Sequence, residues 1–184
     1  MALTPSTMLE LGTALPPFRL PDVDGHLISD RDFAGSPLLV AFICPHCPFV
    51  VHVRDGLGRF AQEYQPRGLA VVGINANDTS QVPEDGPAGM KKEAAAAGYT
   101  FPYLRDESQR VAKAFMAACT PDLYLFDRAH RLVYRGQFDS SRPGKDMPVT
   151  GADLRRAADA MLEGLPVPAD QKPSVGCSIK WKTP

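Results

Sequence analysis

The chain of 184 residues is 44% hydrophobic and 22% charged, a composition that suits one globular domain with a sizeable core. Its formal net charge is −1 and it has no block of like charges, so we expect neither nucleic acid nor membrane among its partners. The N-terminal residues lack the basic start and apolar stretch of a signal peptide, and no apolar run approaches about 18 residues. The expected location is therefore cytoplasmic.

The first expected element is a β-hairpin, which follows an N-terminal start of weak pattern. Residues 18–29 hold two short apolar segments joined by Asp24-Gly25, a dipeptide typical of tight hairpin turns. Ser29 can then cap one helical turn before Gly35 breaks the pattern.

An apolar run then stops at two cysteines. Residues 38–43 are apolar and follow Gly35-Ser36-Pro37, which predicts a buried strand. The residues beyond Cys47 show helical spacing of apolar side chains as far as Pro66-Arg67-Gly68, which is expected to end that helix. Cys44 and Cys47 are thereby placed at a strand-to-helix junction.

The second half of the chain continues the alternation of strands and helices. The expected elements are, in order, a buried strand (69–74), a long polar surface connection (75–87), a helix (88–97), an extended piece (101–104), a helix (107–118), a hairpin (122–126 with 132–134) and a helix capped by Thr150 (to 162). This order predicts a mixed sheet with helices on both faces, in the α/β class. Prolines after 164 predict an irregular tail, so the expected divisions are an N-terminal segment (1–14), one domain (15–164) and a tail packed on it (165–184).

The spacing of the two cysteines points to redox chemistry. Four cysteines are too few for a disulfide scaffold, which leaves a redox or metal role for the close pair. A thiol in the first turn of a helix faces unsatisfied N–H groups and the positive end of the helix dipole, and both favour the thiolate. We expect Cys44 to be the better placed thiol, with His46 stabilising its thiolate.

Two parts of the sequence together resemble the thioredoxin fold. These are the Cys-x-x-Cys at the first helix and an X-Pro that opens a later strand, here Thr120-Pro121. In that fold the proline is cis and faces the cysteines, and the residue before it holds an extended substrate segment by strand-like hydrogen bonds. The resemblance therefore implies substrate-binding roles for Thr120 and Pro121, with Cys119 beside them.

A longer pattern is similar to the redoxin group, which joins alkyl hydroperoxide reductases and thiol-specific antioxidants. The matching segments are residues 18–33, 101–104, 120–127 and 132–136, and a thioredoxin-like subgroup is matched by 75–78, 136–143 and 176–181. The likeness runs from about Leu15 to Lys182.

The departures from these families bear on the activity. Peroxiredoxins carry Pro-x-x-x-Thr/Ser-x-x-Cys, and neither Cys44 nor Cys47 has both the Pro and the Thr/Ser at the required spacing. Thioredoxins have a Trp directly before the first cysteine and a buried acid six residues before it, where this chain has Ile43 and Leu38. The Pro45-His46 pair between the cysteines is found in strongly oxidising disulfide-forming proteins of the thioredoxin fold.

Other interpretations stay open for several residues. A Cys-x-x-Cys can form half of a zinc site, although a second close pair is absent from the sequence. Cys119 and Cys177 can be small buried hydrophobic residues or further redox thiols. Asn75, Asn77 and Asp78 follow a strand at its carboxyl end, where open α/β sheets place their sites, and are candidates for the rim of the site. Ile179 and Trp181 are expected to dock the tail.

The sequence thus predicts a thiol-disulfide oxidoreductase that needs no cofactor or metal. Cys44 is expected to attack a disulfide in a protein or small-molecule substrate, and Cys47 to resolve the mixed disulfide. A thiol electron donor of unspecified identity would then restore the pair. The alternatives are a thiol peroxidase and a non-catalytic zinc-binding or partner-docking module.

Overall fold

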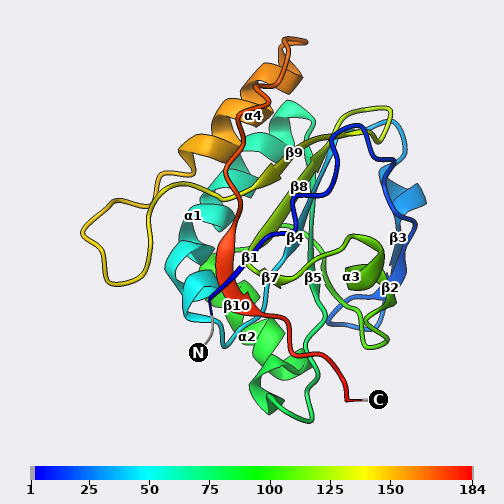
Figure 1. The fold of residues 1–184 in the computed structure, drawn as a ribbon. Coiled ribbons are helices and arrows are strands. Elements are labelled where there is room, and N and C mark those ends of the chain that lie inside the picture. The colour runs from blue at the N-terminus through cyan, green and yellow to red at the C-terminus, as the bar shows by residue number, and fades with distance from the viewer. Residues whose placement is uncertain (1–2, 184) are drawn as a thin grey trace.

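A computed structural model of the chain describes residues 3–183 and shows a central five-stranded sheet of order β6-β5-β4-β8-β9 (Figure 1). The strands β4, β5 and β6 run parallel, whereas β8 is antiparallel to both β4 and β9. The bounds are β4 (Leu38–Phe42), β5 (Ala70–Asn75), β6 (Tyr103–Arg105), β8 (Asp122–Phe126) and β9 (Leu132–Gly136). The predicted mixed sheet is confirmed.

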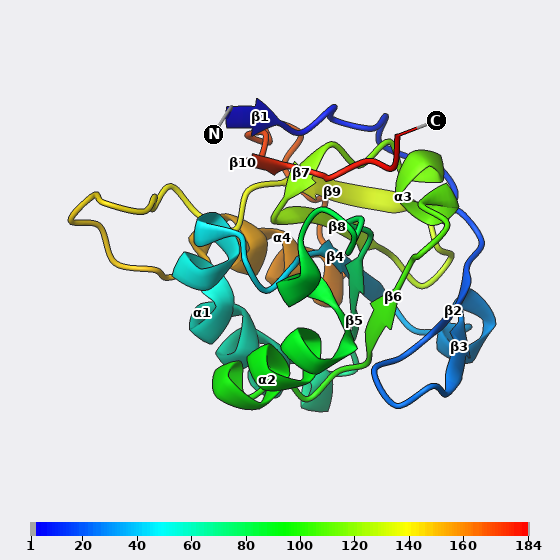
Figure 2. The same cartoon turned by 90° about the horizontal axis from the view of Figure 1, so that it is seen from below.

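Both faces of this sheet are covered, which explains why β4 is a continuous apolar run with all five residues buried. The helices α1 (Pro48–Tyr64), α2 (Pro87–Ala97) and α4 (Ala152–Leu162) pack on one face. The short α3 (Arg110–Ala114) and the hairpin of β2 (Arg19–Pro21) and β3 (Leu27–Ser29) lie on the other, as Figure 2 shows. Helices on both faces and the N-terminal hairpin were expected, and both are confirmed.

The two ends of the chain meet in a second, three-stranded sheet that the sequence pattern did not indicate. Its order is β1 (Leu3–Pro5), β10 (Val175–Ser178) and β7 (Cys119–Thr120), all antiparallel (Figure 1). The expectation of a tail without regular structure is therefore wrong at β10. Its four residues pair with two remote segments, and no local periodicity can reveal such pairing. Residues 1–2 of the expected N-terminal segment and residue 184 of the tail lie outside the described residues.

The chemistry of the caps sets several element boundaries as expected. Ser29 precedes a 3-10 turn, η1 (Asp30–Phe33), and its backbone N–H donates to Asp32 Oδ2 at 2.7 Å in a capping box. After α1 comes a second 3-10 turn, η2 (Gln65–Arg67), which ends at Gly68 with φ 92°, a conformation that glycine adopts without strain.

Three expected elements differ from the structure. The helix expected over 107–118 is shorter, because Gln109 and Met116 have φ values of 61° and 52° and bracket α3. Gly151 and not Thr150 is the N-cap of α4. The connection 75–87 does not run wholly over the surface, since it contains a 3-10 turn, η3 (Pro83–Asp85), whose last residue is fully buried.

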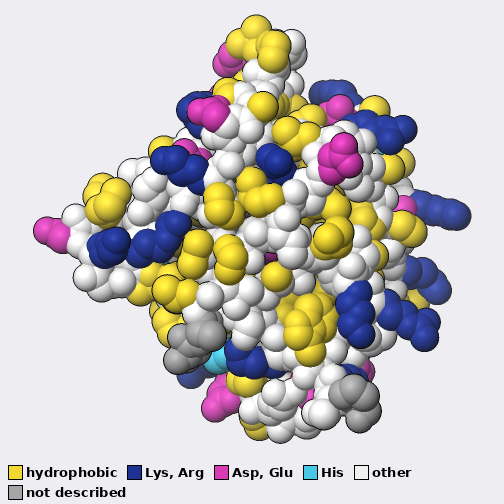
Figure 3. All heavy atoms as spheres, in the orientation of Figure 1, with side chains coloured by type: hydrophobic (Ala, Val, Ile, Leu, Met, Phe, Trp, Pro, Cys, Tyr) yellow, Lys and Arg dark blue, Asp and Glu magenta, His cyan; other side chains and the backbone are white. Residues whose placement is uncertain are grey.

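The outer surface matches the near-neutral composition. In Figure 3, side chains of both charges are interspersed with apolar ones over the face in view. Among residues 3–183, none of the helices has the length and hydropathy that a membrane span requires.

Candidate active site

The two cysteines of the Cys-x-x-Cys lie between the end of β4 and the start of α1, and both side chains are fully buried. Cys47 is the N-cap of α1, and its carbonyl accepts the N–H of Val51 at 2.9 Å. Pro48 occupies the first turn, where the missing N–H costs nothing. Cys44 lies three residues before the cap, so Cys47 and not Cys44 is the thiol nearer the helix dipole.

Thr120 contacts both sulfurs. The Thr120–Pro121 peptide bond is cis, as the resemblance implied. The Thr120 hydroxyl lies 3.4 Å from Cys44 Sγ, and the Thr120 carbonyl oxygen lies 3.2 Å from Cys47 Sγ, where it accepts the S–H of Cys47 in the thiol form. The structure therefore brings the predicted Thr120-Pro121 loop against the cysteine pair.

His46 is held by a buried carboxylate that sequence reasoning missed. The backbone N–H of His46 donates to Asp85 Oδ1 at 3.0 Å, and His46 Nδ1 lies 2.6 Å from Asp85 Oδ2. Because an ionised carboxylate only accepts hydrogen bonds, the imidazole proton of this contact lies on Nδ1. His46 Nδ1 is also 3.7 Å from Cys44 Sγ, which makes Cys44, His46 and Asp85 one cluster.

Two of the expected rim residues lie beneath the site and support Asp85. Asn77 Nδ2 donates to Asp85 Oδ2 at 2.7 Å, and Asn75 Nδ2 donates to the Asp85 carbonyl at 2.8 Å. These bonds offset the cost of burying an ionised carboxyl. Asp78 instead bonds to Ser80 and Gln81 within its own loop. In the sequence, the signal for Asp85 is its place in the polar connection directly after β5. That connection holds several acidic residues, and the pattern does not indicate which of them lies at the site.

The two cysteine sulfurs share a hydrogen bond, which splits their titration. That bond is the largest cause that lowers the pKa of Cys47 to about 5, with further hydrogen bonds from Thr120, Cys177 and the backbone of Val50. The same bond, burial and the nearby Asp85 carboxylate raise the pKa of Cys44 well above its ordinary value. These surroundings favour the thiolate on Cys47, whereas the sequence pattern favoured it on Cys44, because Cys47 has more hydrogen-bond donors and the Asp85 carboxylate opposes the ionisation of Cys44.

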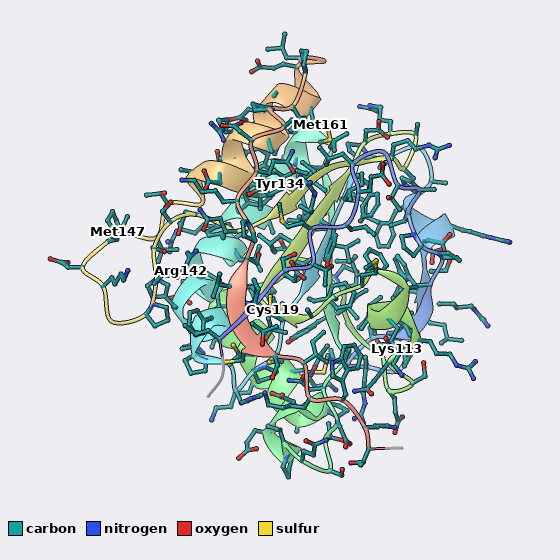
Figure 4. All side chains as sticks on the ribbon, in the orientation of Figure 1. Lys113, Cys119, Tyr134, Arg142, Met147 and Met161 are labelled. Carbon is teal, nitrogen blue, oxygen red and sulfur yellow. The ribbon has the colours of Figure 1, made fainter. Side chains whose placement is uncertain are left out.

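The remaining two cysteines are buried near the pair. Cys119, which Figure 4 labels close to β10, donates its S–H to the Pro121 carbonyl at 3.7 Å, and burial raises its pKa. Cys177 hydrogen-bonds to Cys47, and burial followed by this bond raises the pKa of Cys177 to about 12. Cys119 contacts the backbone of the cis-proline loop, whereas Cys177 contacts the redox pair.

An open groove of about 620 Å³ lies beside Pro45 and His46. Its wall includes Arg54, Lys92 and the buried Glu93, so both charges and apolar surface border the groove. It offers space on the His46 side of the pair for a group that approaches from solvent.

The same cluster could also bind a metal ion. Ligand atoms of Cys44, His46 and Asp85 lie within 4.8 Å of one another, and thiolate, imidazole and carboxylate are the groups that zinc binds. Both oxygens of Asp85 already accept hydrogen bonds from His46 or Asn77, so a metal would replace existing bonds.

Known proteins are similar to this chain in sequence and in fold. The AhpC/TSA family matches residues 11–135. A Mycobacterium tuberculosis protein named "Putative peroxiredoxin" is 33% identical over 148 residues, which cover 78% of this chain and 85% of that protein. A conserved protein of Geobacillus kaustophilus has a structure with a TM-score of 0.97 and 54% identity, covering 100% of this chain and 98% of its own.

A more distant likeness identifies the general fold. A Chlorobium tepidum structure named as a thiol:disulfide interchange protein, DsbE, has a TM-score of 0.64 at 21% identity, and covers 84% of this chain and 99% of its own. The fold is therefore thioredoxin-like. Three observations agree, since the Cys-x-x-Cys lies at a helix start, the cis-proline loop lies against it, and the family matches residues 11–135. The chain therefore belongs to the AhpC/TSA, or redoxin, family of thiol oxidoreductases.

Proposed function

We propose that the chain is a thiol-disulfide oxidoreductase in which Cys44 and Cys47 alternate between a dithiol and a disulfide. The observation that supports this most is that Thr120 of the cis-proline loop contacts both sulfurs at the start of α1, with its hydroxyl 3.4 Å from Cys44 Sγ and its carbonyl oxygen 3.2 Å from Cys47 Sγ. Contacts with the same residue hold the two sulfurs close together, as a disulfide between them requires.

The first step of the proposed reaction is a proton transfer between the two sulfurs. Cys44 passes its proton to the Cys47 thiolate along their hydrogen bond, and the Cys44 thiolate attacks a substrate disulfide. One substrate sulfur leaves and takes a proton from solvent, while Asp85 holds His46 beside Cys44. Cys47 then attacks Cys44 Sγ, and the second substrate sulfur leaves with the Cys47 proton. Two substrate thiols and one Cys44–Cys47 disulfide result.

The groove beside Pro45 and His46 is the proposed approach for the substrate. The backbone of Thr120 was expected to hold an extended substrate, but Thr120 is paired with Cys177 of β10 in this chain. The groove is instead open to solvent and fits a protein segment or a small disulfide. The pair would be restored by a thiol donor, and we propose that the protein acts in the cytoplasm.

Trapping of a mixed disulfide tests the roles of the two thiols. Cys47→Ser should accumulate a covalent complex with a synthetic peptide disulfide, because no resolving thiol is left, whereas Cys44→Ser should not. Cys119→Ser should reduce the peptide at the wild-type rate, since the S–H of this thiol donates to the Pro121 carbonyl and takes no part in the exchange. Absence of a complex in both pair variants, or one tightly bound zinc ion per purified chain, would contradict the proposal.

The low pKa of Cys47 favours a second candidate, a thiol peroxidase. The Cys47 thiolate would attack a hydroperoxide, releasing an alcohol or water and leaving Cys47 as a sulfenic acid. Cys44 would then attack this sulfur and release water, which forms the same Cys44–Cys47 disulfide. Rapid peroxide consumption, with a sulfenic acid on Cys47 in the Cys44→Ser protein, would support this candidate over disulfide reduction.

A further inference from the structure

The C-terminal strand β10 places a third thiol against the redox pair. In the antiparallel pairing of β10 with β7, Cys177 lies directly opposite Thr120, the residue that contacts both Cys44 and Cys47. The Cys177 side chain is 2% exposed and packs in the same core cluster as the pair. The Cys177 and Cys47 sulfurs interact, and this interaction lowers the pKa of Cys47 and raises that of Cys177.

Close backbone packing fixes this position. A Cβ at Gly176 would lie 2.0 Å from the Thr120 carbonyl oxygen, so β10 approaches β7 as only glycine allows. On the far side, β1 pairs with β10, and Leu3 lies opposite Cys177. β10 is the central strand of this sheet, and Figure 2 shows it next to β1 and β7.

The segment after β10 is joined to the same cluster. The N–H of Lys180 donates to Asn77 Oδ1 at 2.8 Å, and Asn77 in turn donates to Asp85, the partner of His46. The tail is therefore hydrogen-bonded to a residue that supports the site. It also occupies the strand position at Thr120 in which the thioredoxin resemblance implies a substrate segment.

From this placement we infer that Cys177 is an internal exchange partner, which takes over the disulfide from Cys44 by attack on Cys47. In this step the Cys177 thiolate attacks Cys47 Sγ of the Cys44–Cys47 disulfide, and that S–S bond breaks. Cys44 leaves as a thiolate and accepts the proton that Cys177 has lost. One disulfide and one thiol are present before and after, so no external oxidant or reductant is needed.

Formation of the Cys44–Cys47 disulfide itself prepares Cys177 for this attack. In the reduced protein, burial is the largest cause that raises the pKa of Cys177. The hydrogen bond to Cys47 and the negative charge of Cys47 are the two other causes that raise it. Both causes disappear when Cys47 enters a disulfide, while Lys180 continues to favour the Cys177 thiolate. After the exchange, Cys44 is again a thiol beside His46, and the disulfide joins Cys47 to Cys177 of β10.

This inference rests on the proposed redox pair, and disulfide mapping separates the two. Full-length wild type and Cys44→Ser are oxidised with diamide, which takes up two electrons and two protons, at low protein concentration. Remaining thiols are blocked and the disulfides are identified by peptide mass. Wild type should contain both Cys44–Cys47 and Cys47–Cys177, and Cys44→Ser should contain Cys47–Cys177. Adding Cys177→Ala to the latter variant should abolish the link, whereas adding Cys119→Ala should leave it.

A second measurement needs no substitution in the redox pair. In the oxidised wild type, iodoacetamide should label Cys44 in the fraction of molecules that carry Cys47–Cys177, and Cys177→Ala should abolish this labelling. Wild type that forms only Cys44–Cys47, with no Cys44 labelling and no link in Cys44→Ser, would overturn the exchange and leave the proposed function intact. A wild type that forms no disulfide at all would remove both.

Discussion

At the scale of single residues, the reactivity of the site depends on which sulfur carries the negative charge. Cys47 and Cys44 have the same chemistry and the same burial, but their surroundings differ. Cys47 accepts hydrogen bonds from Cys44, Cys177 and the backbone, while Cys44 faces the field of Asp85. The number of donors and the distance from a carboxylate decide which thiol ionises first.

The first prediction concerns this ionisation. In the reduced protein, thiolate absorbance in the ultraviolet should rise with a midpoint at about pH 5, because the pKa of Cys47 is lowered to about 5. Cys44→Ala should move the midpoint upward, since the hydrogen bond from Cys44 is the largest cause of the lowering. Cys119→Ala is the matched control and should leave the midpoint in place. A wild-type protein without thiolate below neutral pH would contradict the assignment.

At the scale of elements, close packing of α2 on η3 holds Asp85 at the site. A Cβ at Gly89 of α2 would lie 1.7 Å from the carbonyl oxygen of Glu84, the residue before Asp85. Gly58 of α1 is packed in a similar way, since a Cβ there would lie 2.1 Å from the carbonyl oxygen of Ala97. Alanine usually stabilises a helix by about 1 kcal/mol over glycine, but here the backbone contact outweighs that preference.

The second prediction compares these two glycines. Both Gly89→Ala and Gly58→Ala should lower the melting temperature, because a backbone must shift in each. Only Gly89→Ala should also slow disulfide reduction per folded molecule, since η3 moves with Asp85 and releases His46. Melting curves and turnover at a temperature where both variants are folded provide the measurement. Equal turnover in the two variants would show that Asp85 does not contribute to the reaction.

At the scale of the whole molecule, the redox state and the stability of the fold are linked through Cys47. A thiol whose pKa falls from 9.0 to about 5 on folding stabilises the folded state fully above the unfolded value, and this gain is lost as the pH falls toward 5. The oxidised protein has no ionisable Cys47 and lacks this contribution. Burial is the main cause that raises the pKa values of Glu93 and Asp122 to about 7, so these two acids lower the stability of the fold as the pH rises. They are present in both the reduced and the oxidised protein.

The third prediction follows from this linkage. The melting temperature of the reduced protein minus that of the oxidised protein should increase from pH 5 to pH 8, because the shared acids largely cancel in the difference. Cys47→Ser, treated with the same reductant and oxidant, should show no such pH dependence. A difference that is constant across this range in wild type would contradict a low pKa for Cys47.

The sequence by itself determined the order of the main elements and the position of the redox pair. The apolar run 38–43, the Pro48 helix start and the Thr120-Pro121 strand entrance are local patterns, and the structure has each of them. Such features follow from the spacing of neighbouring side chains and from backbone chemistry, which need no knowledge of distant contacts.

Only the tertiary structure decided what surrounds the two sulfurs. It brought Asp85 to His46 and Cys177 to Cys47, and it assigned the lower pKa to Cys47 rather than Cys44. These contacts join segments far apart in the chain, and no periodicity connects such segments. Burial and the local count of charges and donors set the pKa of a thiol, so the ionisation of the pair is fixed only when the whole fold has closed around it.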